Sequence, residues 1–130
     1  MKSGLEPGLA AEIEVVVTPE MCPHFEGVLV HPIYATWTLV HHMEIVGRKL
    51  LVPFLEDHEE GVGAHISLDH VSPAHIGSTV VVRARVESCT HHRLTTAMSA
   101  RCGKRTLATG TFVQVILPKS KLAAIIERHR

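Results

Sequence analysis

A single change in the hydrophobic period divides this chain and restricts what it can fold into. Residues 35–52 place apolar side chains at three- and four-residue steps, which is the spacing of an amphipathic helix. From residue 62 onward, apolar and polar side chains alternate, which is the spacing of a β-strand. The sequence therefore predicts one long helix followed by a series of strands.

The alternating pattern predicts five strands in all. The first covers residues 12–17, ahead of the helix, and the other four cover residues 62–71, 79–88, 92–101 and 105–117. Pro118 ends the last strand, and residues 119–130 are expected to form a short exposed helix. Residues 21–32 have no clean period and are expected to form a loop or lid.

The short connections predict that the last four strands are antiparallel neighbours. A single helix cannot be buried by hairpins unless the sheet curls around it. We therefore expect an α+β fold of the hotdog type, in which a curved antiparallel sheet of about five strands wraps around one long central helix. The length of 130 residues fits one domain, residues 1–130. Such a sheet leaves an edge uncovered, which predicts a homodimer, or a tetramer built from dimers.

Composition excludes several classes of partner. Thirteen basic and thirteen acidic residues cancel without a run of either sign, which argues against nucleic-acid and membrane-surface binding. Cys22, Cys89 and Cys102 lack the paired spacing of a zinc or redox site, and no phosphate loop or dinucleotide fingerprint is present. We therefore expect that the protein needs no metal or cofactor. We also expect it to be cytoplasmic, because no signal peptide or membrane-length apolar run is present.

Glu44 is the first candidate for chemistry. Together with Met43 and Gly47, it falls on the apolar stripe of the helix, where a carboxylate must be partnered, neutralised or used. The structural alternative is an ordinary surface ion pair with Arg48, four residues further on. Periodicity alone does not choose between the two interpretations.

His70 is the second candidate. It continues the inward-facing positions of the strand that begins with Val62, Ala64, Ile66 and Leu68, so it is expected to meet Glu44 in the core. The structural alternative is a hydrogen-bonded core histidine.

Four positions together resemble a known family. Ala35-Thr36, Glu44 eight residues after the threonine, Gly63, and His70 seven residues later are similar to the pattern of the fluoroacetyl-CoA thioesterase type of hotdog protein. The resemblance implies hydrolysis of a small or short-chain acyl-CoA thioester. It makes Thr36, Glu44 and His70 the catalytic residues, and the backbone N–H near Gly63 would polarise the thioester carbonyl.

Within that resemblance, Glu44 would be the nucleophile or the general base and His70 the general acid or base. Thr36 has a second interpretation, as a cap at the helix N-terminus. About 12 Å of helical rise separates it from Glu44, so a shared site would need an irregular start to the helix or a second subunit.

The lid residues of the family are not matched clearly, so a general short-chain acyl-CoA thioesterase is expected rather than a fluoroacetyl-specific enzyme. Phe25 and Tyr34 are candidate substrate-binding residues. Trp37 is a third candidate for the pocket lining, although core packing is the role expected for it. The alternative function is a non-catalytic module that binds acyl-CoA or another hydrophobic ligand. A hydratase is less consistent with the sequence, because no suitably placed aspartate accompanies the histidine.

Overall fold

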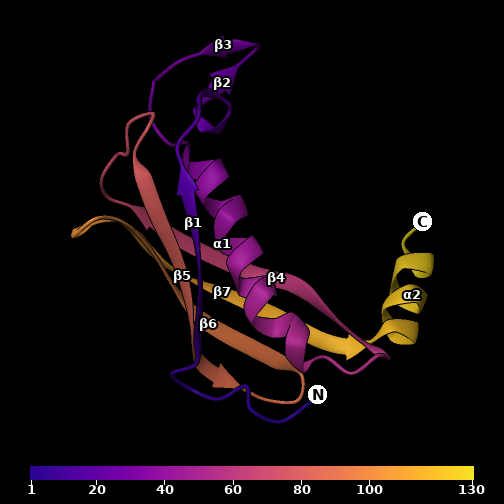
Figure 1. Cartoon of the computed structure of the whole chain (residues 1–130). Coiled ribbons are helices and arrows are strands. Elements are labelled where there is room, and N and C mark those ends of the chain that lie inside the picture. Colours follow the sequence, from indigo (N-terminus) through magenta and orange to yellow (C-terminus); the bar gives the residue numbers. More distant parts are fainter.

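The computed structural model describes residues 1–130 and contains one long helix that crosses a curved sheet (Figure 1). The helix, α1, covers Thr36–Leu51, and a 3₁₀ turn, η2 (Val52–Phe54), follows it. Pro53 lies in that turn, because its ring removes an amide donor and cannot continue the helix. The predicted helix, residues 35–52, is confirmed to within one residue at each end.

The sheet contains five antiparallel strands, and all five were predicted. They are β1 (Ala10–Val16), β4 (Glu59–His70), β5 (Thr79–Cys89), β6 (Arg93–Cys102) and β7 (Arg105–Pro118). The C-terminal helix α2 (Lys119–Arg128) follows β7 and has no buried residue. It projects from one end of the sheet (Figure 1), as the prediction of a short exposed helix requires.

The strand order corrects one expectation. The order is β1-β5-β6-β7-β4, so β4 pairs with β7 and not with β5, its neighbour in sequence. The connection between β4 and β5, residues 71–78, is not a tight turn, and it carries the chain from one edge of the sheet toward the other. Hairpins therefore join only β5, β6 and β7, and β4 is an edge strand.

The core lies between α1 and the concave face of the sheet. Leu39, Met43, Val46 and Leu51 of α1 are fully shielded from solvent. They pack against the inward side chains of β5, including Val82 and its neighbours at alternate positions. Burying such a side chain stabilises a fold by roughly 1.5–3 kcal/mol, so this contact holds the helix in the sheet.

A β-bulge in β4 changes which residues of the strand face α1, so part of the predicted alternation is wrong. Gly63 pairs with Gln114 and His65 pairs with Val113, so Ala64 is an extra residue with no partner. Upstream of the bulge it is Gly61, not Val62, that faces α1, because a Cβ on Gly61 would lie 2.5 Å from Leu51 Cδ2. Downstream, Ile66 is partly buried as predicted. A period-2 pattern cannot reveal the bulge, since the extra residue shifts the alternation by one.

The segment predicted as a loop or lid is more ordered than expected. A 3₁₀ turn, η1 (Pro19–Met21), leads into it, and it contains a hairpin of two short strands, β2 (His24–Phe25) and β3 (Val28–Leu29). The hairpin lies beyond the N-terminal end of α1 and outside the five-stranded sheet (Figure 1). No helix in the chain has both the length and the apolar character to cross a membrane.

Gly110 permits the close approach of β7 to β4. A Cβ at this position would lie 2.0 Å from the backbone carbonyl oxygen of Ser67. We expect Gly110→Ala to lower the free energy of unfolding by roughly 1–3 kcal/mol or more, because a backbone atom must move to relieve the overlap. Chemical denaturation measures the change. Thr109→Ala, at the exposed neighbouring position, is the matched control, and equal stability of both variants would contradict the prediction.

Candidate active site

Thr36 and His70 are brought together although 34 positions separate them in the sequence. The Oγ1 atom of Thr36 lies 2.9 Å from Nδ1 of His70, within hydrogen-bond distance. The threonine is the first residue of α1, and the histidine is the last residue of β4. The bond can run in either direction: the hydroxyl donates to a bare Nδ1, or a protonated Nδ1 donates to the hydroxyl oxygen.

This contact also decides the role of Thr36 at the helix end. Ala35 occupies the N-cap position, and no side chain caps the helix. Thr36 therefore does not cap α1, and its hydroxyl points to the imidazole instead. The Nε2 atom of His70 is shielded from solvent and has no hydrogen-bond partner. A buried ring nitrogen without a partner is uncommon, and it is available to a substrate.

A cavity of about 580 Å³ adjoins this pair. Tyr34, Phe25 and Trp37 are among the residues that line it, together with Thr36 and His70. Trp37 is half exposed rather than packed in the core, and its ring meets that of Phe25 edge to face with centroids 5.3 Å apart. The core role expected for Trp37 is therefore wrong, and its alternative role in the pocket lining is the one found, because the hairpin that carries Phe25 lies outside the sheet and leaves the indole at the cavity.

Glu44 and Gly63 form a second pair, in a different place. A Cβ on Gly63 would lie 3.3 Å from Oε1 of Glu44, so the carboxylate passes directly over the glycine. Both residues line a smaller cavity of about 270 Å³, beside Phe112 and the bulged segment of β4. Glu44 is exposed rather than buried in the core, which corrects the sequence expectation. It lies on the flank of the buried face of α1 that is turned toward β4.

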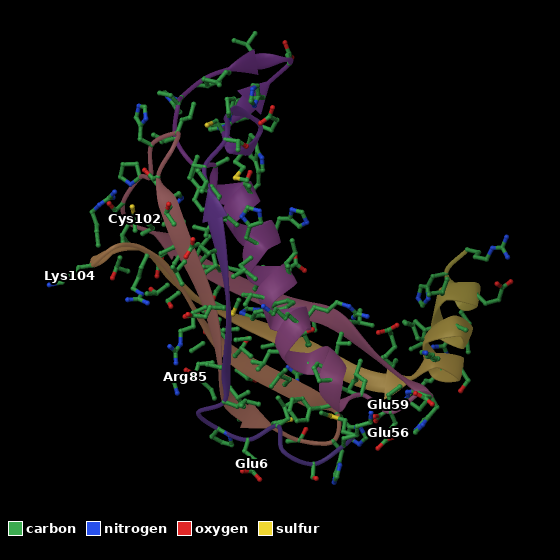
Figure 2. All side chains as sticks on the ribbon, in the orientation of Figure 1. Glu6, Glu56, Glu59, Arg85, Cys102 and Lys104 are labelled. Atoms are coloured by element: carbon green, nitrogen blue, oxygen red, sulfur yellow. The ribbon has the colours of Figure 1, made fainter.

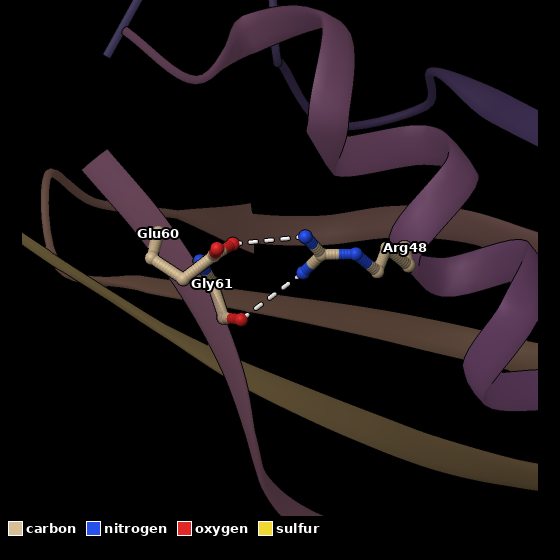
Figure 3. A network of polar contacts seen from close by, with 3 residues as sticks. All are labelled: Arg48, Glu60 and Gly61. Carbon is tan, nitrogen blue, oxygen red and sulfur yellow. Dashed lines mark hydrogen bonds and ion pairs between the residues drawn. The ribbon is translucent and has the colours of Figure 1, made fainter. Parts of the chain in front are cut away.

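The surface ion pair between Glu44 and Arg48, which was the structural alternative, does not form. Arg48 donates to Glu60 Oε1 at 2.9 Å and to the Gly61 carbonyl oxygen at 3.1 Å (Figure 3). The side chain of Glu60 also accepts from the Gly61 amide, and its pKa is lowered mainly by the hydrogen bond from Arg48. Arg48 thus ties α1 to β4 through a residue other than Glu44, whose carboxylate has no ion-pair partner.

The two pairs do not meet within one chain. Glu44 and Gly63 line one cavity, whereas Thr36 and His70 line another. Along α1, the two helix residues are separated by about 12 Å of rise. The expected meeting of Glu44 with His70 in the core of one subunit is therefore not found. The bulge and the diagonal crossing of α1 over β4 set which helix residue adjoins which strand residue.

A partly buried pair beside the cavity escaped sequence reasoning. The hydroxyl of Tyr34 is hydrogen bonded to Nδ1 of His42, on the second turn of α1. Burial raises the pKa of Tyr34, so the phenol keeps its proton and can donate it to the neutral imidazole. Sequence reasoning considered His41 and His42 only as metal ligands, and consecutive residues on a helix do not have the spacing of a metal-binding pair. No group of three or more His, Cys, Asp or Glu side chains is placed to hold a metal ion.

The stability of the fold is expected to depend on the protonation of His42. Burial lowers the pKa of His42, and the nearby His41 lowers it further. As the pH falls through the ordinary histidine range, about 6.5, the unfolded chain takes up a proton that the folded chain resists, so stability is lost. Above that range the contribution is fully present.

We therefore expect the His42→Gln variant, whose amide oxygen can accept from Tyr34, to lose less stability than the wild type on acidification. Denaturant unfolding between about pH 5 and 8 provides the comparison. The other histidines are common to both proteins, so the difference in slope reports on His42. Parallel stability curves would refute the assignment.

Comparisons with known proteins agree with this architecture. The sequence pattern of the family described as "Fluoroacetyl-CoA-specific thioesterase" matches residues 17–120. The fluoroacetyl-CoA thioesterase of Streptantibioticus cattleyicolor is 27% identical over 134 residues, which cover 98% of this chain and 96% of that protein.

Solved structures show the same fold. A Thermus thermophilus protein described as a thioesterase superfamily member superposes with a TM-score of 0.90 and 41% identity, over 97% of this chain and 93% of that one. A structure of the fluoroacetyl-CoA thioesterase superposes with a TM-score of 0.87 and 25% identity, over 98% and 99% of the two chains. The hotdog fold expected from the sequence is confirmed, and the chain belongs to the fluoroacetyl-CoA-specific thioesterase family of thioester hydrolases.

Proposed function

We propose that this protein hydrolyses the thioester of a small or short-chain acyl-CoA, with Thr36, Glu44 and His70 as its catalytic residues. The observation that carries the proposal is the hydrogen bond between Thr36 and His70 at the cavity, with the second ring nitrogen of the histidine unpartnered. An imidazole oriented through one nitrogen can exchange a proton at the other.

The bond changes involve Glu44, His70 and Gly63, while Thr36 orients the imidazole of His70 through their hydrogen bond. Glu44 either attacks the acyl carbon directly or removes a proton from the water that attacks it. When Glu44 acts as a base, the water oxygen bonds to the acyl carbon as the C–S bond breaks, and His70 delivers a proton to the departing thiolate. When Glu44 attacks directly, the same C–S cleavage and protonation leave an acyl anhydride on Glu44, which a water molecule then hydrolyses to restore the carboxylate. The products are a carboxylic acid and the free thiol.

Gly63 supplies the third position. The bulge at Ala64 interrupts the ladder between β4 and β7, which frees backbone groups from pairing. A backbone N–H of this segment can then donate to the oxygen that becomes negative during attack, a contribution worth roughly 3 kcal/mol in other enzymes. The absence of a side chain on Gly63 leaves room for Glu44 beside it.

The substrate-binding part of the proposal concerns Phe25 and Tyr34. Both line the larger cavity, where Phe25 packs edge to face with Trp37. The acyl group would lie against these rings. The proposed substrate class is short-chain acyl-CoA in general, because the aromatic lid residues of the fluoroacetyl enzymes are not matched clearly in residues 25–34.

The active site is proposed to be completed by a second copy of the chain. Each of the four site positions has an exposed large apolar neighbour in sequence: Trp37 (50% exposed), Ile45 (42%), Val62 (36%) and Val71 (68%). Apolar side chains at this level of exposure, next to an unpaired strand edge, favour association with another molecule.

Pairing of β4 with β4 of a second copy would join the two halves. If the two-fold axis passed midway between Gly63 and His70, antiparallel pairing would set Gly63 of each copy opposite His70 of the other. Glu44 of one subunit would then approach the Thr36 and His70 pair of its partner.

The proposed cytoplasmic location is consistent with the three cysteines, all of which are free thiols.

The role of Glu44 is tested by Glu44→Gln. We expect kcat for acyl-CoA hydrolysis to fall by about a hundred- to ten-thousand-fold, with stability almost unchanged, because the carboxylate is exposed and makes no ion pair. Thiol release from a panel of acyl-CoAs measures turnover. Glu87→Gln, an exposed glutamate on β5, is the control. Unimpaired turnover by Glu44→Gln would remove Glu44 from the mechanism, and ligand binding by the wild type without thiol release would favour a binding module.

The shared site is tested by mixing two inactive variants. Glu44→Gln and His70→Asn chains, unfolded together and refolded, should form mixed dimers in half of the assemblies, and each mixed dimer would have one intact site of two. We expect about a quarter of wild-type activity, against nearly none for either variant alone. Measurement of molecular mass in solution checks that dimers form. A mixture as inactive as its components would place each site within a single chain.

A further inference from the structure

Arg105 contacts two residues that line the larger cavity and has no compensating charge. It is the first residue of β7 and pairs with Cys102 across the turn from β6. Figure 2 shows Cys102 and Lys104 at this turn, at the opposite end of the sheet from Glu56 and Glu59. The amides of Val71 and Ser72 both donate to the Leu107 carbonyl oxygen, so the start of β7 runs beside the segment that leaves β4.

The guanidinium is held by two uncharged groups. One terminal nitrogen donates to the hydroxyl of Ser72 and to the carbonyl oxygen of Pro73. Both of these residues line the cavity that Thr36 and His70 adjoin. Pro73 follows His70 by only three positions, so the Cα atoms of these two residues lie at most about 10 Å apart.

The charge of Arg105 is not neutralised by the protein. Ion pairs join Met1 to Glu59, Arg48 to Glu60, Arg83 to Glu12, and Arg130 to Glu127, and none involves Arg105. The residues that line the cavity include two histidines and no carboxylate. A guanidinium has five N–H donors, so those of its remaining nitrogens are free to bind an anion.

We propose that Arg105 binds an anionic oxygen group of the thioester substrate, either a phosphate of the CoA carrier or a carboxylate on the acyl group. This inference rests on the proposed thioesterase function and adds a recognition element to the same cavity. Because Ser72 and Pro73 hold the side chain in place, little conformational entropy remains to be lost when the anion binds.

Three thioesters separate the two sources of charge. Butyryl-CoA has phosphates as its only anionic groups. Succinyl-CoA has the same number of acyl carbons with a carboxylate in place of the terminal methyl, and the butyryl thioester of N-acetylcysteamine has neither anion. The variant is Arg105→Gln, which keeps a polar side chain and removes the charge. Arg105→Lys restores the charge.

Recognition of phosphate predicts that Arg105→Gln lowers kcat/KM for both CoA thioesters by roughly ten- to a hundredfold, through KM, and spares the N-acetylcysteamine thioester. Recognition of a carboxylate predicts the same loss for succinyl-CoA alone. In either case Arg105→Lys should recover part of the loss. Arg101→Gln is the matched control, because Arg101 pairs with Thr106 and lies on the opposite face of the sheet from Arg105.

Two results would overturn the inference. An equal loss for all three thioesters would mean that Arg105 only fixes the segment after β4, and no loss for any of them would mean that the side chain has no part in binding. In both cases the wild type still turns over the butyryl thioesters, so the proposed function stands. Failure of the wild type to hydrolyse any of the three would instead overturn the function and the inference together.

Discussion

The packing of α1 into the concave face of the sheet is the contact on which the rest of the structure depends. Leu39, Met43, Val46 and Leu51 have no exposure to solvent, and they fix both the position and the rotation of the helix. Once that rotation is set, Glu44 must lie on the flank that faces β4, and Thr36 must lie at the end that faces His70. The candidate site therefore follows from hydrophobic burial elsewhere on the same helix.

The edge strand β4 carries most of the functional geometry and the least regular backbone. Its bulge at Ala64 changes which residues face the helix, and it places Gly63 beneath the carboxylate of Glu44. Bulges are common at sheet edges and beside active sites, where they reorient a side chain or free a backbone amide. An edge strand that is bulged, exposed and flanked by apolar side chains is also suited to pair with a second copy.

Much of the fold could be predicted from the sequence, for identifiable reasons. The five strands and the long helix were predicted because their periods differ, and Pro53 and Pro118 mark ends that the backbone cannot continue. The pairing of β4 with β7 was not predicted, because a connection of intermediate length does not reveal which edge of a sheet it reaches. The facing of Val62 and Ala64 was wrong because one extra residue inverts a period of two. Trp37 was assigned to the core from its size alone, without knowledge of what covers it.

The sequence by itself determined the types and order of the elements, because these follow from apolar periods and from the positions of prolines. It also indicated the family, through the intervals between Thr36, Glu44, Gly63 and His70. Only the tertiary structure decided that Thr36 contacts His70, that Glu44 lies over Gly63, and that Arg48 pairs with Glu60. These contacts join residues on different elements. They depend on how α1 crosses the sheet and where β4 is bulged, and no local pattern of residues encodes either.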